Sequence, residues 1–367
     1  MTRVILDGLK KRSGAVDAVD GASLEIRSGE LTCLVGPAGS GKTTLATLVA
    51  GLVAPDQGEI YFGDRMVNEL SPIERGVSFV PADLGLWPAL SVADNVAFPL
   101  EAKRIPRGER KRRAAEMLTG LRIDSLSGRR PGQLSPSQRV KAALARALVT
   151  EPRLLVLDEP LAGLEPRARD EFAPTLKRIL AEAGATTLLL TDDAAQALAM
   201  ADVLAVIDLG RIVQSGAPRE LYNRPVDVFV ARLLGPTNLV QGQIEGNLSE
   251  SAGEVVVRTP LGRLVGQARA PIPPAGSPVT ISIRPDALST SAAGPVNWNR
   301  FPATLERILF RGELCHVHAR ARGDWPVIFA PLQSQAKDLR EGQSATLAVA
   351  PENFVVLPGR FAVAGTP

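Results

Sequence analysis

The sequence contains few residues of the types that mark disulfide-linked or metal-binding proteins. Only two cysteines occur among the 367 residues, Cys33 and Cys315, and they lie far apart in the chain. Neither a disulfide framework nor a cysteine metal site is therefore indicated, and we expect a protein of a reducing compartment. Aromatic residues make up only 4% of the chain, and the only two histidines are His316 and His318.

Long apolar runs are also absent. No run reaches the ~18 residues that a membrane-spanning helix needs, and residues 1–7 lack the apolar core of a signal peptide. The net charge of +3 is too weak to indicate a nucleic-acid partner. With 45% hydrophobic and 22% charged residues, a chain of this length is expected to form two or perhaps three globular domains. Such a protein can work at a membrane only by docking on one.

The most informative stretch is Gly36–Thr43, which fits the phosphate-binding pattern G-x-x-x-x-G-K-[ST]. The apolar run at residues 31–35 predicts a buried strand before it, and residues 44–50 predict a helix after it, closed by Gly51. Glycines in such a loop turn backbone N–H groups inward toward an anion, and the helix dipole assists. The alternative is a simple glycine turn between strand and helix. The candidate phosphate-binding residues are Gly36, Pro37, Ala38, Gly39, Ser40, Gly41, Lys42, Thr43 and Thr44.

Two carboxylates follow another apolar strand. Residues 154–157 predict a buried strand that leads directly into Asp158 and Glu159. Acidic residues at a strand end beside a phosphate loop suit phosphoryl transfer, which depends on positioning and charge neutralisation. The oxygens of Thr43 and Asp158 are of the type that Mg²⁺ prefers. The alternative for this pair is a solvated strand end.

The order of predicted elements indicates an α/β core followed by a β-rich region. Antiparallel strands before residue 31 precede strands at 59–62, 77–80, 154–157, 187–190 and 203–207, with a helical segment over about 83–150. After residue 235 the pattern changes to short strands separated by Gly, Pro and Ser turns. We therefore expect an α/β P-loop NTPase domain over residues 1–235, followed by an all-β domain, a small barrel or sandwich, over residues 236–367.

Taken together, these motifs resemble those of the ATP-binding subunits of ABC transporters. Residues 154–160 are similar to the Walker B strand of that family, and Leu134-Ser135-Pro136-Ser137-Gln138 occupies the position of its signature motif. Residues 75–96 are similar to the stretch around the Q-loop, which faces the membrane subunit in the family. Arg284-Pro285-Asp286 is similar to a motif of the C-terminal OB-like TOBE domain that type I importers of maltose, polyamines, sulfate or ferric iron carry.

The resemblance implies specific cofactors, roles and partners. The cofactors would be ATP and Mg²⁺, with Thr43 and Asp158 as metal ligands and Glu159 as the catalytic residue that polarises water. Ser135, Pro136, Ser137 and Gln138 would contact ATP held by a second ATPase subunit, in a homodimer or heterodimer. Transmembrane permease subunits would dock through coupling helices at the cytoplasmic face of the membrane, and an extracytoplasmic solute-binding protein would act indirectly. No nucleic acid is implied.

Several positions depart from the family pattern. Ser13 stands where an adenine-stacking aromatic is expected, Ala82 where the Q-loop glutamine is expected, and Asp192 where the switch histidine is expected. Pro136 and Ser137 replace the signature glycines, and Glu165 replaces the D-loop aspartate. A carboxylate near a polyphosphate repels it unless it is protonated, bridged by a cation or turned away.

These departures leave two functions open. The chain is either the ATP-hydrolysing, energy-coupling subunit of a type I importer, or a weakly hydrolytic regulatory subunit that forms a heterodimer with an active ATPase. A soluble ABC protein of translation or DNA repair is disfavoured, because such chains carry paired cassettes or long coiled coils and this one does not.

Two further patterns have alternative explanations. The basic run at residues 103–113 is typical of a solvated helix face, although a membrane surface or nucleic acid would also attract it. Residues 315–318 read Cys-His-Val-His and suggest a metal site, but strand alternation would separate the cysteine from the histidines. We expect ordinary strand residues there.

Overall fold

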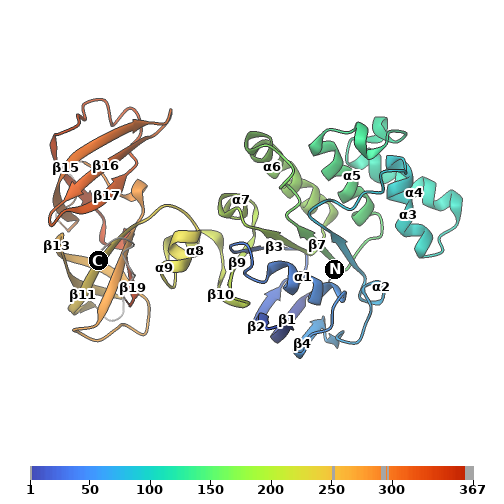
Figure 1. Ribbon diagram of the computed structural model, residues 1–367, viewed down its shortest axis with the longest axis horizontal. Coiled ribbons are helices and arrows are strands. Elements are labelled where there is room, and N and C mark those ends of the chain that lie inside the picture. The colour runs from blue at the N-terminus through green and yellow to red at the C-terminus, as the bar shows by residue number, and fades with distance from the viewer. Residues whose placement is uncertain (1, 250–252, 291–294, 296, 360–367) are drawn as a thin grey trace. The chain divides into compact units, whose positions relative to one another are not determined.

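The computed structural model describes residues 2–249, 253–290, 295 and 297–359, and its internal contacts divide the chain into two compact units, Met1–Arg219 and Glu220–Pro367 (Figure 1). The division between the units lies after residue 219, earlier in the chain than the boundary expected after residue 235. Helix α8 (Pro218–Asn223) spans this division and α9 (Val228–Leu233) follows it, and backbone carbonyls of Tyr222 and Ala231 in these helices bind Arg284, as described below.

Unit 1 contains two sheets of different kinds. A six-stranded sheet has the order β10-β9-β3-β8-β7-β6, and all its neighbours are parallel except the antiparallel pair β9 and β10. Its strands are β3 (Leu31–Val35), β6 (Val77–Val80), β7 (Leu154–Asp158), β8 (Thr187–Thr191), β9 (Val203–Asp208) and β10 (Arg211–Gly216). An antiparallel sheet has the order β2-β1-β4-β5, from β1 (Val4–Ser13), β2 (Val16–Ile26), β4 (Gln57–Phe62) and β5 (Arg65–Met66).

The short apolar runs predicted as strands form the centre of the parallel sheet. Every residue of β3, β7 and β8 is buried, as expected for strands covered on both faces. The helices of unit 1 are α1 (Lys42–Ala50), α2 (Pro72–Arg75), α3 (Val92–Ala102), α4 (Arg107–Gly120), α5 (Pro136–Leu148), α6 (Pro166–Ala183) and α7 (Ala194–Met200).

Helix α1 packs between the two sheets. Leu45, Leu48 and Val49 of α1 are completely buried in one core with residues of β1, β2 and β4 on one side and of β7, β8 and β9 on the other. The helix ends at Gly51, whose left-handed backbone (φ 77°) lets its N–H bond back to Leu48 O. The predicted helix stop is confirmed.

A buried arginine satisfies the last carbonyl groups of α1. The Arg75 guanidinium donates to Leu48 O at 2.7 Å and to Val49 O at 2.9 Å, and also to the carbonyls of Asn68 and Leu70. Arg75 is only 1% exposed, and burial lowers the pKa of its guanidinium. Because these carbonyl groups accept from a single planar group, the C-terminal end of α1 is tied to the segment before β6.

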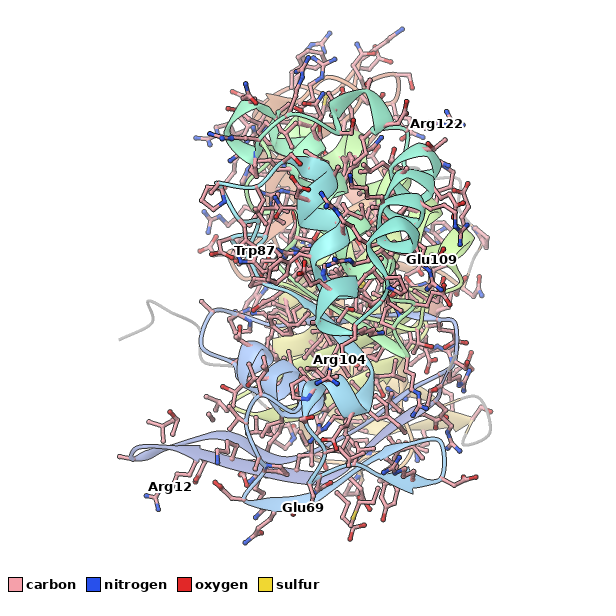
Figure 2. All side chains as sticks on the ribbon, turned by 90° about the vertical axis from the view of Figure 1, so that its right-hand side faces the viewer. Arg12, Glu69, Trp87, Arg104, Glu109 and Arg122 are labelled. Carbon is pink, nitrogen blue, oxygen red and sulfur yellow. The ribbon has the colours of Figure 1, made fainter. Side chains whose placement is uncertain are left out.

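Helices α3, α4 and α5 form the helical segment expected from the sequence. From Arg107 on, the basic run lies on α4, which carries Glu109 (labelled in Figure 2). Glu109 pairs with Arg112 and Arg113 at 2.7 Å, and Arg112 also reaches Glu116 at 2.6 Å. These pairs hold the pKa of Glu109 at about 2, chiefly through hydrogen bonds from Arg112 and Arg113. These ion pairs lie on a solvated helix face and offset part of the positive charge of the run.

Unit 2 consists of a barrel, a second sheet and short helices. A closed barrel joins β11 (Asn238–Ser249), β12 (Glu254–Thr259), β13 (Gly262–Ala268), β19 (Phe354–Pro358) and β14 (Pro278–Ile283). A four-stranded sheet has the order β17 (Trp325–Phe329), β16 (Cys315–Ala321), β15 (Asn299–Phe310) and β18 (Ser344–Val349). Side chains of both form one apolar core. The predicted fold class, a P-loop α/β domain followed by an all-β, OB-like domain, is confirmed.

Arg284 explains why α8 (Pro218–Asn223) and α9 (Val228–Leu233) associate with unit 2. Its guanidinium donates to Ala231 O and Gly235 O at 2.9 Å, and to Tyr222 O at 3.0 Å. It also lies 4.0 Å from the centre of the Tyr222 ring, a cation–π contact. The compact unit therefore includes residues before 236, because the arginine binds their backbone.

The cysteines and histidines are strand residues, as expected. Cys33 is fully buried in β3, and burial raises the pKa of its thiol to about 12. On β16, Cys315 is buried whereas His316 and His318 are partly exposed on the other face. In the described part of the chain no group of three or more His, Cys, Asp or Glu residues is arranged to hold a metal ion.

We predict that Arg75→Met lowers the free energy of unfolding by about 3 kcal/mol, because several buried carbonyl groups lose their donor. Arg27→Met is the matched control, since Arg27 is 67% exposed and contributes only a surface ion pair. Chemical denaturation of the full chain measures both changes. Equal stability of the two variants would contradict the role assigned to Arg75.

Candidate functional site

The carboxyl ends of three parallel strands bring the predicted site residues together. The register pairs Val35 of β3 with Thr191 of β8, and Asp158 of β7 with Leu190 of β8. The segments that follow these strands therefore emerge side by side at one edge of the sheet. A pocket of about 620 Å³ lies there, lined by Ser13, Val16, Asp17, Ala18, Ala38, Gly39, Gly41, Lys42, Thr43, Thr44, Asp158, Glu159, Asp192, Leu209 and Gly210.

The glycine loop wraps around the amine of Lys42. Lys42 Nζ donates to Gly36 O at 2.7 Å and to Pro37 O at 3.1 Å, so the positive charge lies at the centre of the loop. Gly41 has φ 101°, and a Cβ there would lie 2.3 Å from Ala18 O. No other residue fits that position without displacing β2. Ser40 Oγ is buried and has no hydrogen-bond partner among the described residues, so the loop contains an unsatisfied hydroxyl.

Thr43 and Asp158 are in direct contact. Thr43 Oγ1 donates to Asp158 Oδ2 at 3.2 Å, which places a hydroxyl and a carboxylate at the edge of the same pocket. Burial raises the pKa of Asp158, while the Thr43 hydrogen bond and the Lys42 charge oppose that shift. A partly desolvated oxygen pair beside a lysine suits a hard cation together with an anion.

Glu159 and Asp192 form a second acidic pair in the pocket. The backbone N–H of Glu159 donates to Leu190 O at 3.0 Å, and Glu159 has a left-handed backbone with φ 47°. Burial raises the pKa of the Glu159 carboxyl and the neighbouring Asp192 carboxylate raises it further, whereas the Lys42 charge and a hydrogen bond from the Asp192 backbone N–H lower it. The residue that replaces the family's switch histidine thus acts electrostatically on the predicted catalytic carboxylate.

The adjacent acid, Asp193, has a structural role. Its side chain caps α7 by accepting from Gln196 N at 3.0 Å, and Arg169 Nη1 lies 3.1 Å from its other oxygen. Asp193 is thereby held away from the pocket, while exposed Asp192 lines it. Of these two neighbouring acids, only Asp192 belongs to the site.

The signature residues lie at the start of α5 and do not line the pocket of their own chain. Ser135 and Gln138 form a capping box, in which Ser135 N donates to Gln138 Oε1 at 2.9 Å and Gln138 N donates to Ser135 Oγ at 3.3 Å. Pro136 occupies the first helical position, where its fixed φ suits a helix start. The S-x-x-Q pattern of a capping box was present in the sequence, so this local structure was predictable.

Two other altered positions are also outside this pocket. Ala82 is exposed beyond the end of β6, and Glu165 is exposed at the N-terminal cap of α6. Ser13, in contrast, lines the pocket as expected. Val16 and Leu209, both highly exposed, also line it and were not predicted. The signal for Leu209 was the dipeptide Leu-Gly shortly after the predicted strand at 203–207, where a hairpin turn usually has Asn-Gly.

Comparison with known proteins agrees with this geometry. The ABC transporter family model matches residues 19–162, and the TOBE domain model matches residues 281–357. No helix among the described residues has both the length and the apolar character to cross a membrane.

Named relatives match most of the chain. The sulfate/thiosulfate import ATP-binding protein CysA 2 of Chromobacterium violaceum is 38% identical, covering 86% of this chain and 83% of its own length. The spermidine/putrescine import ATP-binding protein PotA of Rubrobacter xylanophilus is 35% identical, covering 97% and 94%. The solved structure of MJ1267, an ATP-binding cassette of an ABC transporter, is similar with a TM-score of 0.57 and 27% identity over 64% of this chain and 98% of that one. The chain therefore belongs to the ATP-binding subunits of ABC transporters, in the importer class that carries a C-terminal TOBE domain.

Proposed function

We propose that this chain is the energy-coupling subunit of a type I importer, which binds Mg-ATP in the pocket of unit 1 and passes the resulting closure to membrane permease subunits. The observation that carries the proposal is the convergence of Lys42, Thr43 and Asp158 within that pocket, with Thr43 Oγ1 and Asp158 Oδ2 3.2 Å apart. A lysine inside a glycine loop and an oxygen pair beside it suit a nucleoside triphosphate and its metal.

Each residue has a distinct role in this proposal. Lys42 exchanges its bonds to the Gly36 and Pro37 carbonyls for bonds to phosphate oxygens, and the loop amides and the Ser40 hydroxyl assist. Thr43 and Asp158 would hold Mg²⁺, which supplies charge neutralisation when bound. Glu159, at the end of the same strand, orients water and accepts its proton.

The partners are a second ATPase subunit and the permease. Ser135, Pro136, Ser137 and Gln138 lie at the N-terminal end of α5, so a second subunit can meet them with its own nucleotide. The complex would lie at the cytoplasmic face of the membrane, where the permease receives solute from an extracytoplasmic binding protein. The relatives named above import sulfate or thiosulfate in one case and polyamines in the other, solutes of opposite charge. The ATP-binding chain therefore does not by itself set the solute.

We predict that Lys42→Ala weakens ATP binding by about 10- to 100-fold, because a buried charge-assisted contact to phosphate is lost. Lys177→Ala is the matched control, since Lys177 pairs with Asp202 at 3.2 Å on the surface and does not line the pocket. Calorimetric titration of the full chain with Mg-ATP measures both. Retained affinity in Lys42→Ala would place the nucleotide site elsewhere.

A second candidate function is a weakly hydrolytic subunit that completes a heterodimer with an active ATPase. The observation that favours it is Asp192, whose carboxylate lines the pocket and raises the pKa of Glu159. Its charge opposes both the ionised form of Glu159 and an approaching polyphosphate. In a heterodimer the partner supplies an unaltered signature to this site, so mixing the two subunits should increase turnover.

We predict that Asp192→His increases ATP turnover of the full chain by about 10-fold, because it replaces a repelling charge with a hydrogen-bond donor. Asp192→Asn, which only removes the charge, should give part of that gain. Asp64→His is the control, since Asp64 is exposed in a turn outside the pocket. A steady-state phosphate-release assay compares the three variants with the wild type. Turnover that is already fast in the wild type, or unchanged in Asp192→His, would argue against an inhibitory Asp192.

A further inference from the structure

A leucine occupies a strained, exposed position at the pocket. Leu209 and Gly210 form the two-residue turn between β9 and β10, closed by the pairing of Asp208 with Arg211. Both central residues have positive φ, 45° and 77°, as in a type I′ turn. Asn-Gly is the usual sequence there, because a leucine in a left-handed conformation is strained. Leu209 is also 77% exposed, so burial of its side chain does little to offset the backbone strain.

The turn is rigidly attached to the phosphate loop. Gly210 N donates to Ser40 O at 2.9 Å, and Asp20 N donates to Gly210 O at 3.0 Å. Arg211 Nε donates to Asp20 Oδ2 at 2.9 Å and ties the same turn to β2. The position of Leu209 relative to the loop is therefore set by hydrogen bonds of Gly210 and Arg211, the two residues that follow it in the chain.

The same pocket contains a second exposed aliphatic side chain. Val16, at the tip of the β1–β2 hairpin and paired with Ser13, is 67% exposed. Val16 and Leu209 are the two large aliphatic residues among those that line the pocket. Ser13, which also lines it, has no ring on which a base could stack.

We infer that Leu209, together with Val16, forms the apolar surface on which the base of a bound nucleotide packs, in place of the aromatic side chain that position 13 lacks. The inference rests on the proposed nucleotide site, since it places the triphosphate on the Lys42 loop. An exposed, strained leucine lowers the stability of the nucleotide-free protein. When a base packs on its side chain, apolar surface is buried and binding becomes more favourable. Aliphatic side chains make no hydrogen bonds to a base, so this surface should favour the binding of adenine and guanine nucleotides equally.

The test uses Leu209→Asn in the full chain. Asparagine tolerates the left-handed conformation, so the melting temperature of the free protein should rise by about 1 to 2 °C. The same variant should bind ATP and GTP about 3- to 10-fold more weakly, because the apolar contact is lost. Binding of inorganic tripolyphosphate, which has no base, should not change. Val16→Thr, of nearly equal shape, should weaken ATP binding in the same direction.

Arg122→Asn is the matched control. Arg122 also has a left-handed backbone, with φ 57°, and is exposed. Figure 2 shows it at the end of unit 1 opposite the hairpin that carries Arg12, so it is remote from the pocket. Its replacement should raise the stability of the protein without changing its affinity for ATP.

Lys42→Ala should weaken the binding of ATP and of tripolyphosphate alike. This comparison separates failure of the phosphate site from failure of the base contact. Unchanged ATP affinity in Leu209→Asn, or an equal loss for tripolyphosphate, would overturn the inference.

Discussion

The position of helix α1 between two sheets is the constraint on which the site of unit 1 depends. Leu45, Leu48 and Val49 are buried in a core shared by the parallel and antiparallel sheets, and this packing holds the helix between them. Its C-terminal carbonyls are held by Arg75, and its N-terminus carries Lys42 and Thr43. Because the helix is held along its length, the first-turn residues meet Asp158 with a defined geometry.

The parallel register extends this geometry to the acidic residues. Strands β3, β7 and β8 end at the same edge, so the segments after them converge although they are far apart in sequence. The result is an uneven balance of charge, with Lys42 in the loop and four acidic residues, Asp17, Asp158, Glu159 and Asp192, lining the same pocket. A triphosphate entering with a metal ion is therefore attracted by Lys42 and opposed by Asp192. Under the second candidate function proposed above, the loop supports nucleotide binding while the acidic pair slows hydrolysis.

In unit 2 a second arginine, Arg284, binds backbone carbonyls of several segments. The Arg284 guanidinium donates to backbone carbonyls of Tyr222, Ala231, Gly235 and Pro236, and its face lies over the Tyr222 ring. A planar group with several donors can bind carbonyls from α8, from α9 and from the segment after α9 at once. These contacts join residues 220–235, which lie before the predicted start of the second domain, to the β-rich unit.

The sequence by itself determined the elements and the chemical types at the site. Buried strands at 31–35, 154–157 and 187–190, the glycine loop and the paired acids after residue 157 were all readable, because short apolar runs, glycine patterns and strand-end acids are local signals. Tertiary structure decided which residues share the pocket. Only the fold shows that Asp192 faces Glu159 while Asp193 caps α7, and that Leu209 is held beside the phosphate loop by Ser40 and Asp20. Those contacts join segments that are close only when the sheet is assembled, so no local pattern in the chain specifies them.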